Sequence, residues 1–154
     1  MRTPGSTLNA ALLILGGLLG AQWGWTQSYP QSVTELIVQA KAQVPTIDLA
    51  KFKSGFDTSS LGLIVDVREP ADYAAGHIPG ALNIPRGLIE FRIWPHVGFP
   101  DKLDLNARIT LYCGSGARAA LAAKSLRDLK FTNVTAADMR FEDWTRAGYP
   151  LAAE

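Results

Sequence analysis

Two kinds of hydrophobic pattern alternate along the chain. Leu61–Val67 (LGLIVDV) and Ile109–Tyr112 (ITLY) are nearly continuous apolar runs that are rich in branched residues. Such runs are typical of strands that are covered on both faces, as in a parallel sheet. Leu82–Ile84 and Asn133–Ala136 are shorter runs of the same kind, and they predict two further strands.

Between these runs, apolar residues recur every three or four positions, which predicts helices. Strands that alternate with helices in a chain of 154 residues predict an α/β domain. We expect a central, mainly parallel sheet of about five strands with helices on both faces. Residues 94–102 contain two prolines and a glycine and are predicted to form a loop. The predicted helices are Pro70–Ala75, Leu88–Ile93, Ala117–Leu129 and Phe141–Ala147.

Two more helices are predicted ahead of the first long strand. Ser32 and Glu35 have the spacing of a capping box, so a helix is expected to begin there and to run to about Gln43. Residues 47–56 predict a second helix, with Asp48 as its N-cap. The residues expected to face the domain are Leu36, Ile37 and Ala40 in the first helix, and Leu49, Phe52 and Phe56 in the second.

The N-terminal residues differ in character from the rest. After Arg2, residues 10–19 (AALLILGGLL) carry no charge, and this run is shorter than the roughly 20 apolar residues that a membrane span requires. We therefore expect residues 1–26 to be a signal peptide that exports the chain to the periplasm. The alternative is an uncleaved membrane anchor, which Trp23 and Trp25 favour. The remaining parts are an N-terminal helical arm, residues 27–45, and the domain itself, residues 46–154.

The composition limits the classes of partner. With 47% hydrophobic and 19% charged residues the chain is typical of a single globular domain. A formal net charge of +1 gives no reason to expect nucleic-acid binding, which needs a basic face. Two distant histidines and one cysteine show no metal-ligand spacing, so we expect no metal and no cofactor.

The chemistry is concentrated after the strand Ile109–Tyr112, where Cys113-Gly-Ser-Gly-Ala-Arg118 leads directly into an alanine-rich helix. Ligand sites in α/β sheets form at the carboxyl ends of strands. Gly114 and Gly116 allow turns that direct successive N–H groups toward one point, and the helix begins beside Cys113. A free cysteine is often an inert core residue, but these neighbours favour a reactive thiolate. The guanidinium of Arg118 suits an oxyanion.

Several motifs follow one another along the chain: Ile64–Glu69 (IVDVRE), Tyr73, Gly76–Pro85 (GHIPGALNIP), the Cys113–Arg118 loop, Trp144 and Gly148–Pro150. Together they make the chain resemble the rhodanese family of sulfurtransferases, in its single-domain form. The resemblance implies that Cys113 takes sulfur from a donor such as thiosulfate or mercaptopyruvate and holds it as a persulfide. The sulfur then passes to cyanide or a thiol, and we expect a monomer. The resemblance further implies that substrate and persulfide are held by Gly114, Ser115, Gly116, Ala117 and Arg118.

The Cys113–Arg118 segment, called the active loop below, also departs from the pattern of the rhodanese family. Many members that use thiosulfate have a basic residue directly after the cysteine, where this chain has Gly114. The run Cys113–Gly116 is closer to mercaptopyruvate sulfurtransferases, so the donor stays open. Arg86 could supply the missing positive charge, although a solvated surface arginine is the favoured interpretation.

Other polar residues lie near the predicted strand ends. Asp66 and Arg68 could touch the active loop, but an ion pair with Glu69 or Asp72 is the favoured interpretation. His77 could act as a base, yet its place in a turn that leads into a strand favours a structural role. Trp94, Phe99 and Trp144 are expected in the core or in a pocket wall.

Two alternative functions deserve comparison. Tyrosine phosphatases also combine a cysteine, a set of loop amides and an arginine, but they place five residues between Cys and Arg. Here there are four, from Gly114 to Ala117, and Tyr112 stands where phosphatases usually have histidine. We therefore reject the phosphatase. A sulfur carrier without turnover, or a rhodanese-like binding module for a periplasmic partner, remains open because a carrier needs the same persulfide.

Overall fold

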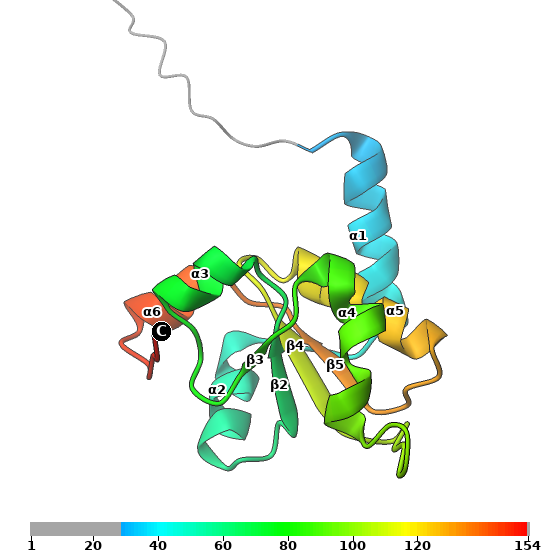
Figure 1. Ribbon diagram of the computed structural model, residues 1–154. Coiled ribbons are helices and arrows are strands. Elements are labelled where there is room, and N and C mark those ends of the chain that lie inside the picture. The colour runs from blue at the N-terminus through cyan, green and yellow to red at the C-terminus, as the bar shows by residue number, and fades with distance from the viewer. Residues whose placement is uncertain (1–28, 154) are drawn as a thin grey trace, which may run out of the picture.

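The computed structural model describes residues 29–153, which fold around one five-stranded sheet (Figure 1). Every pair of neighbouring strands is parallel. The predicted parallel sheet is therefore confirmed. The sequence pattern missed β1, because its two residues are too few to show a period. In sheet order the strands are β1 (Thr46–Ile47), β5 (Val134–Ala137), β4 (Ile109–Tyr112), β2 (Leu63–Asp66) and β3 (Leu82–Asn83).

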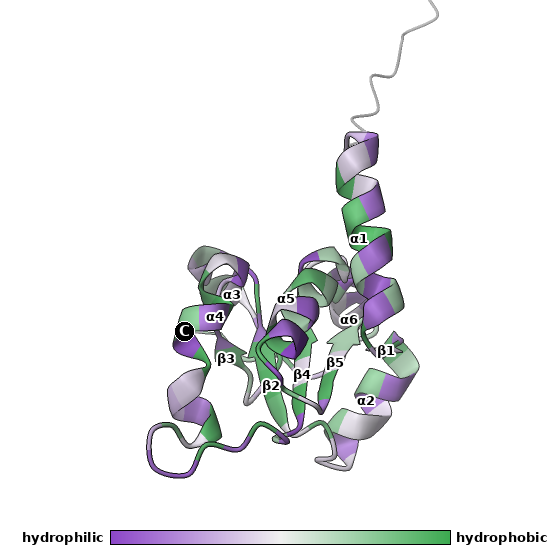
Figure 2. Ribbon diagram, turned by 90° about the vertical axis from the view of Figure 1, so that its right-hand side faces the viewer, coloured by the Kyte–Doolittle hydropathy of each residue, from purple (hydrophilic) through white to green (hydrophobic). Residues whose placement is uncertain are grey.

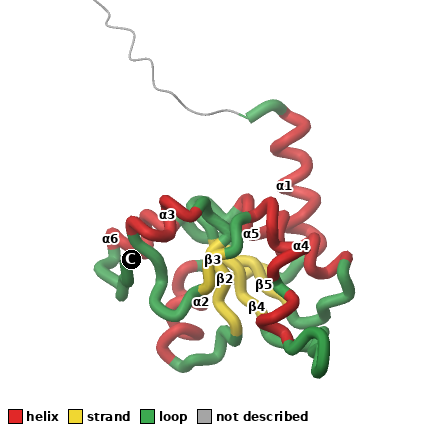
Figure 3. The backbone as a smooth tube through the Cα atoms, viewed as in Figure 1, coloured by secondary structure: helices red, strands yellow, loops and turns green. Residues whose placement is uncertain are grey.

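Helices cover both faces of this sheet, as predicted (Figure 3). One face packs against α1 (Gln31–Gln43), α4 (Ile89–Arg92) and α5 (Ala117–Asp128). The other face packs against α2 (Leu49–Asp57) and α6 (Phe141–Arg146). The remaining helical segments are α3 (Pro70–Ala75) and the 3-10 turns η1 (Arg86–Leu88) and η2 (Trp94–Val97).

The central strand β4 divides its side chains between the two cores. Successive residues of a strand point to opposite faces. Ile109, Leu111 and the following Cys113 therefore join the core beneath α5, while Tyr112 joins the aromatic core beneath α2 and α6. There Phe52 packs edge-on against Tyr112 and Trp144, with ring centroids 6.1 and 5.6 Å apart. The hydrophobic central strands are visible in Figure 2.

The helix of the N-terminal arm begins earlier than predicted. Its N-cap is Pro30, whose φ of −50° suits a helix start, and no side chain caps it. The predicted capping box of Ser32 and Glu35 is therefore wrong. Both residues lie inside α1, where Gln31 Nε2 donates a hydrogen bond to Glu35 Oε1 at 2.6 Å.

The arm does pack on the domain, through one stripe of α1. Ala40 and the following Val44 are buried in the core beneath α5, and Ile37 is half-buried. Leu36 is 51% exposed, so its predicted place on this face is wrong. In Figure 1, α1 stands beside α5 and extends past the carboxyl end of the sheet.

Three further local expectations have mixed outcomes. Asp48 caps α2 as predicted, because its Oδ1 accepts a hydrogen bond from the Lys51 amide at 2.8 Å. The predicted loop after Ile93 instead begins with η2, which ends at Gly98 with a φ of +85°. Trp144 is fully buried, but Phe99 is 56% exposed and does not belong to the core.

The predicted signal segment, residues 1–26, lies outside the described residues, as do the first two residues of the predicted arm. Export therefore stays a prediction. None of the helices in residues 29–153 is both long and apolar enough to cross a membrane.

Candidate active site

Cys113 lies at the carboxyl end of β4, directly before the loop that leads into α5. Its side chain is a free thiol with no exposed surface, so the sulfur lies beneath the loop. Gly116 has a φ of +82°, and a Cβ there would come within 2.9 Å of Asp138 Oδ1. Only glycine fits this position without strain, because the loop must turn sharply while it packs against the end of β5.

Two carbonyl groups of the loop accept hydrogen bonds from helices, whereas the loop amides have no acceptor among the described residues. Gly114 O accepts a hydrogen bond from the Phe141 amide at 3.1 Å, and Gly116 O accepts one from Ala120 at 3.0 Å. Among residues 29–153, no acceptor is hydrogen-bonded to the amides of residues 114–118. Open amides at a helix N-terminus attract negative charge. The surroundings of Cys113 can therefore hold an anion.

Arg118, in the first turn of α5, lies beside this loop. A Cβ on Gly114 would be 3.7 Å from Arg118 Nη2, so the guanidinium is close to the residue after Cys113. Its ion-pair partner is Glu69, with Nη1 and Oε1 3.7 Å apart and side chains 39% and 65% exposed. An exposed pair of this length is weak. The guanidinium can therefore turn from Glu69 to a bound anion at little cost.

Asp66 and Arg68 pair with each other, not with Glu69 or Asp72 as predicted. Both are buried, and Arg68 Nη2 donates to Asp66 Oδ2 at 2.6 Å while Nε lies 3.0 Å from both carboxylate oxygens. The two residues are two positions apart at a strand end, where side chains emerge on the same side. Burial alone lowers the pKa of Arg68, but the Asp66 carboxylate outweighs it and the pKa is raised.

The pair reaches the Cys113 loop through an aromatic ring. The Arg68 guanidinium lies 3.9 Å from the centroid of Phe141, whose amide donates to Gly114 O. Arg68 therefore supports the loop indirectly, through its contact with Phe141. Nearby, burial raises the pKa of Tyr112 well above its usual range, and the charge of Asp66 adds to this. Tyr112 stays neutral, and its hydroxyl accepts a hydrogen bond from the Ile78 amide at 3.0 Å.

Arg86 does not supply a second positive charge to the loop, contrary to the conjecture. Its guanidinium donates to Glu90 Oε1 and Ser125 Oγ, both at 2.9 Å, and so joins α4 to the second half of α5. His77 has the structural role that was expected. Its buried ring stacks on Tyr73 with centroids 3.7 Å apart, and its backbone pairs with Ala152.

A cavity of about 400 Å³ lies beside the active loop, and sequence reasoning missed its other wall. The loop side is formed by Ser115, Ala117 and Arg118. The opposite side comes from Tyr29, Val33 and Ile37 of the arm. No periodicity could reveal this contact, because it depends on how α1 is placed against α5 and not on the pattern within either helix.

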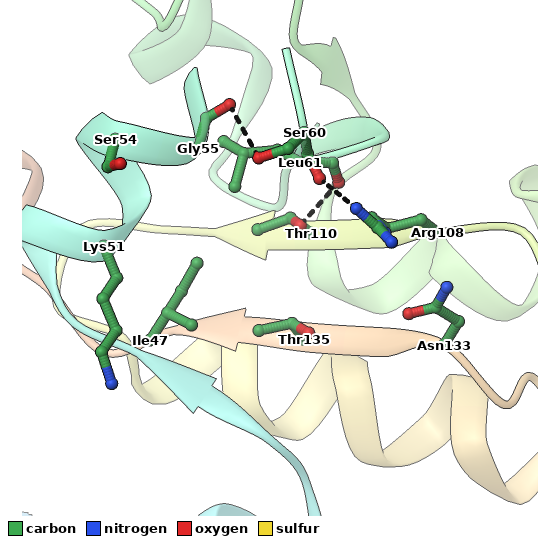
Figure 4. A pocket seen from close by; sticks show the side chains of 10 residues that line it. All are labelled: Ile47, Lys51, Ser54, Gly55, Ser60, Leu61, Arg108, Thr110, Asn133 and Thr135. Carbon is green, nitrogen blue, oxygen red and sulfur yellow. Dashed lines mark hydrogen bonds between the residues drawn. The ribbon is translucent and has the colours of Figure 1, made fainter. Parts of the chain in front are cut away.

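A second cavity of similar volume, about 400 Å³, opens at the other end of the sheet (Figure 4). It lies between α2 and the amino ends of the strands, where Arg108 Nη1 donates to Ser60 O and Thr110 Oγ1 to Leu61 O. Ligand sites of parallel sheets form at carboxyl ends, so this cavity is not the candidate active site. Nowhere in residues 29–153 do three His, Cys, Asp or Glu side chains gather as a metal site would require.

Comparison with known proteins agrees with this geometry. The family model described as "Rhodanese-like domain" matches residues 48–147. The "Putative sulfur carrier protein YrkF" of Bacillus subtilis is 34% identical over 104 residues, which is 68% of this chain and 52% of that protein. The chain thus spans about half the length of that relative. "Thiosulfate sulfurtransferase GlpE" of Pseudomonas entomophila is 35% identical over 88 residues, 57% of this chain and 73% of that protein.

Among solved structures, a protein of unknown function from Rhodopseudomonas palustris, described as a "Possible Tyrosine Phosphatase", is 27% identical. The match has a TM-score of 0.67 and covers 84% of this chain and all of that one. The family model covers the sheet from α2 to α6, including the Cys113 loop. The chain therefore belongs to the family of rhodanese-like domains, whose members include sulfurtransferases.

Proposed function

We propose that this chain is a rhodanese-type sulfurtransferase that carries sulfane sulfur on Cys113. The observation that supports this most directly is the loop of residues 114–118, which directly follows Cys113 and whose amides have no acceptor among the described residues. A persulfide anion or a sulfur oxyanion would satisfy these donors. We also propose that it acts as a monomer in the periplasm, the location that residues 1–26 predict.

The proposed reaction has two half-reactions that balance without a cofactor. The Cys113 thiolate attacks the outer sulfur of thiosulfate, an S–S bond forms, and sulfite leaves with the electron pair of the broken bond. Cyanide or a thiolate then attacks the outer sulfur of the persulfide and restores the Cys113 thiolate. With mercaptopyruvate the leaving group is pyruvate, and the proton of the donor thiol ends on its methyl group.

A second candidate is a sulfur carrier that passes its persulfide only to a protein partner. The name of the Bacillus subtilis relative favours this alternative. Both functions need the same first half-reaction and differ only in the acceptor. We do not propose a phosphatase, because the four residues between Cys113 and Arg118 make a tighter loop than the five that hold a phosphate.

The first prediction concerns the covalent carrier. Incubation with thiosulfate or mercaptopyruvate should add one sulfur atom to the chain, measured as intact mass. Cys113→Ser should abolish both this adduct and the formation of thiocyanate, because a hydroxyl cannot form a persulfide. Cys113 is the single cysteine, so the adduct has no alternative site. A sulfur adduct on the serine variant, or none on the native chain with any donor, would contradict the proposal.

The second prediction concerns the donor anion. Arg118→Ala should raise KM for thiosulfate and lower kcat/KM about ten- to a hundredfold, because a charge-assisted hydrogen bond is worth about 1.5–3 kcal/mol. Arg118→Lys should recover only part of this loss. Glu69→Gln is the matched control, because it removes the partner of Arg118 and leaves the guanidinium in place.

Steady-state kinetics with thiosulfate, and with an uncharged persulfide donor beside it, measure the effect. We expect Glu69→Gln to leave kcat/KM unchanged or to raise it, since a negative charge beside the anion is lost. Equal losses with charged and uncharged donors in Arg118→Ala would show that the arginine only stabilises the loop.

The third prediction tests the support behind the loop. Arg68→Met should lower the free energy of unfolding by about 3–5 kcal/mol, because it leaves the Asp66 carboxylate buried without its partner. The double variant Asp66→Asn, Arg68→Met should lose less than the sum of the two single variants. Denaturant unfolding measures all three. An additive result would mean that the two side chains do not depend on each other.

A further inference from the structure

The cavity beside the active loop combines two chemistries on opposite sides. Val33 and Ile37 of α1 and Leu121 of α5 give it an apolar wall. Arg118 and Ser115 give it a cationic and a polar group at the loop. A cavity of about 400 Å³ is within the range of about 300–1,000 Å³ that is usual for small-molecule sites. It is therefore far larger than an inorganic sulfur anion needs.

The apolar wall is held in place relative to the loop. Ala40 and Val44 bury the second half of the arm in the core beneath α5. Lys41 Nζ is 2.6 Å from Asp138 Oδ1, and Asp138 is the residue that packs against Gly116 of the loop. The arm is thus connected to the end of β5, which packs against the active loop at Gly116. Ile37 and Val33, about one and two turns before Lys41 in α1, are positioned by these contacts.

An apolar wall gives no advantage to thiosulfate or cyanide, which have no apolar surface to bury. It favours a compound with a hydrocarbon substituent. The neighbouring guanidinium favours an anionic group on the same molecule. A molecule that satisfies both sides is an organic anion with its sulfur near the charged end.

We propose that α1 is a specificity element, and that Val33 and Ile37 bind the hydrocarbon substituent of an organic sulfane-sulfur donor whose anionic end lies at Arg118. This inference rests on the proposed function and adds the class of donor. Both residues lie outside the segment 48–147 that matches the family model, so the domain alone does not supply this selectivity.

Alkanethiosulfonates, R–SO₂–S⁻, are suitable probes of this donor class. The Cys113 thiolate attacks the outer sulfur, the Cys113–S bond forms, and the bond between the sulfonyl and the outer sulfur breaks. The sulfinate R–SO₂⁻ leaves with the electron pair. Two negative charges enter the step and two leave it, so no oxidant, reductant or proton is required.

The experiment compares methane-, propane- and hexanethiosulfonate as donors, with cyanide as the acceptor. In the native chain kcat/KM should rise with chain length, about two- to fourfold for each methylene that is buried. Val33→Ser and Ile37→Ser should flatten this rise and lower kcat/KM for the hexyl donor about tenfold, while thiosulfate turnover stays within about twofold.

Val38→Ser is the matched control. Val38 is on the same helix, is 61% exposed and does not line the cavity. The substitution Val38→Ser makes the same chemical change as Val33→Ser, at nearly the same cost in helix propensity. The control should keep the full dependence on chain length. Equal losses in Val33→Ser and Val38→Ser would overturn the proposal, as would a rate that is independent of chain length in the native chain.

A binding measurement separates this inference from the proposed function. Hexane-1-sulfonate has the same substituent and the same charge as the hexyl donor, but an oxygen replaces the transferable outer sulfur. Calorimetry should show that it binds the native chain at least tenfold more tightly than methanesulfonate, and that Val33→Ser removes the difference. If Cys113 forms no persulfide but this preference is found, the proposed function fails and the cavity assignment stands. If persulfide forms but the preference is absent, only the cavity assignment fails.

Discussion

The buried ion pair of Asp66 and Arg68 joins the segments that surround the Cys113 loop. Arg68 Nη2 donates to Gly76 O at 2.7 Å, which fixes the end of α3. Asn83 Nδ2 donates to the carbonyl groups of both members, which fixes β3. Through Phe141 the pair also reaches Gly114 and α6. Burying two charges is costly unless each is fully paired and hydrogen-bonded, and here that requirement sets the positions of four neighbouring segments.

Arg68 and Arg118, both near the Cys113 loop, therefore differ in how firmly their guanidinium groups are held. Arg68 is buried and its guanidinium is committed to the Asp66 carboxylate and to Gly76 O. Arg118 is 39% exposed, and within residues 29–153 its one ion-pair partner is the Glu69 carboxylate at 3.7 Å. A guanidinium that builds the fold cannot also bind a substrate, because releasing it would leave Asp66 unpaired. Arg118 is free of that constraint, which makes it the arginine that can take an anion.

The sequence predicts the sheet and the position of Cys113 between β4 and α5 well, because both depend on local patterns. A continuous apolar run, two glycines and an alanine-rich helix suffice to place Cys113 at the end of β4. It is harder to predict which side chains form ion pairs and which helices pack together. The choice of Asp66 as partner of Arg68 depends on which charges the fold buries, and the contact of α1 with the loop depends on packing between helices. Neither leaves a periodic signal in the chain.

The burial of Cys113 is the reason why the proposal gives the arm a part in donor binding. A thiol without exposed surface cannot be contacted over a broad area, so a donor must bind mainly to the groups around it. On one side these are the loop amides and Arg118, which recognise charge and would serve any sulfur anion equally. In the proposed function, discrimination between donors would come from the other wall of the cavity, to which α1 contributes Val33 and Ile37. In this proposal the rhodanese-like domain supplies the reactive cysteine, and the preceding helix α1 supplies the apolar surface that distinguishes one donor from another.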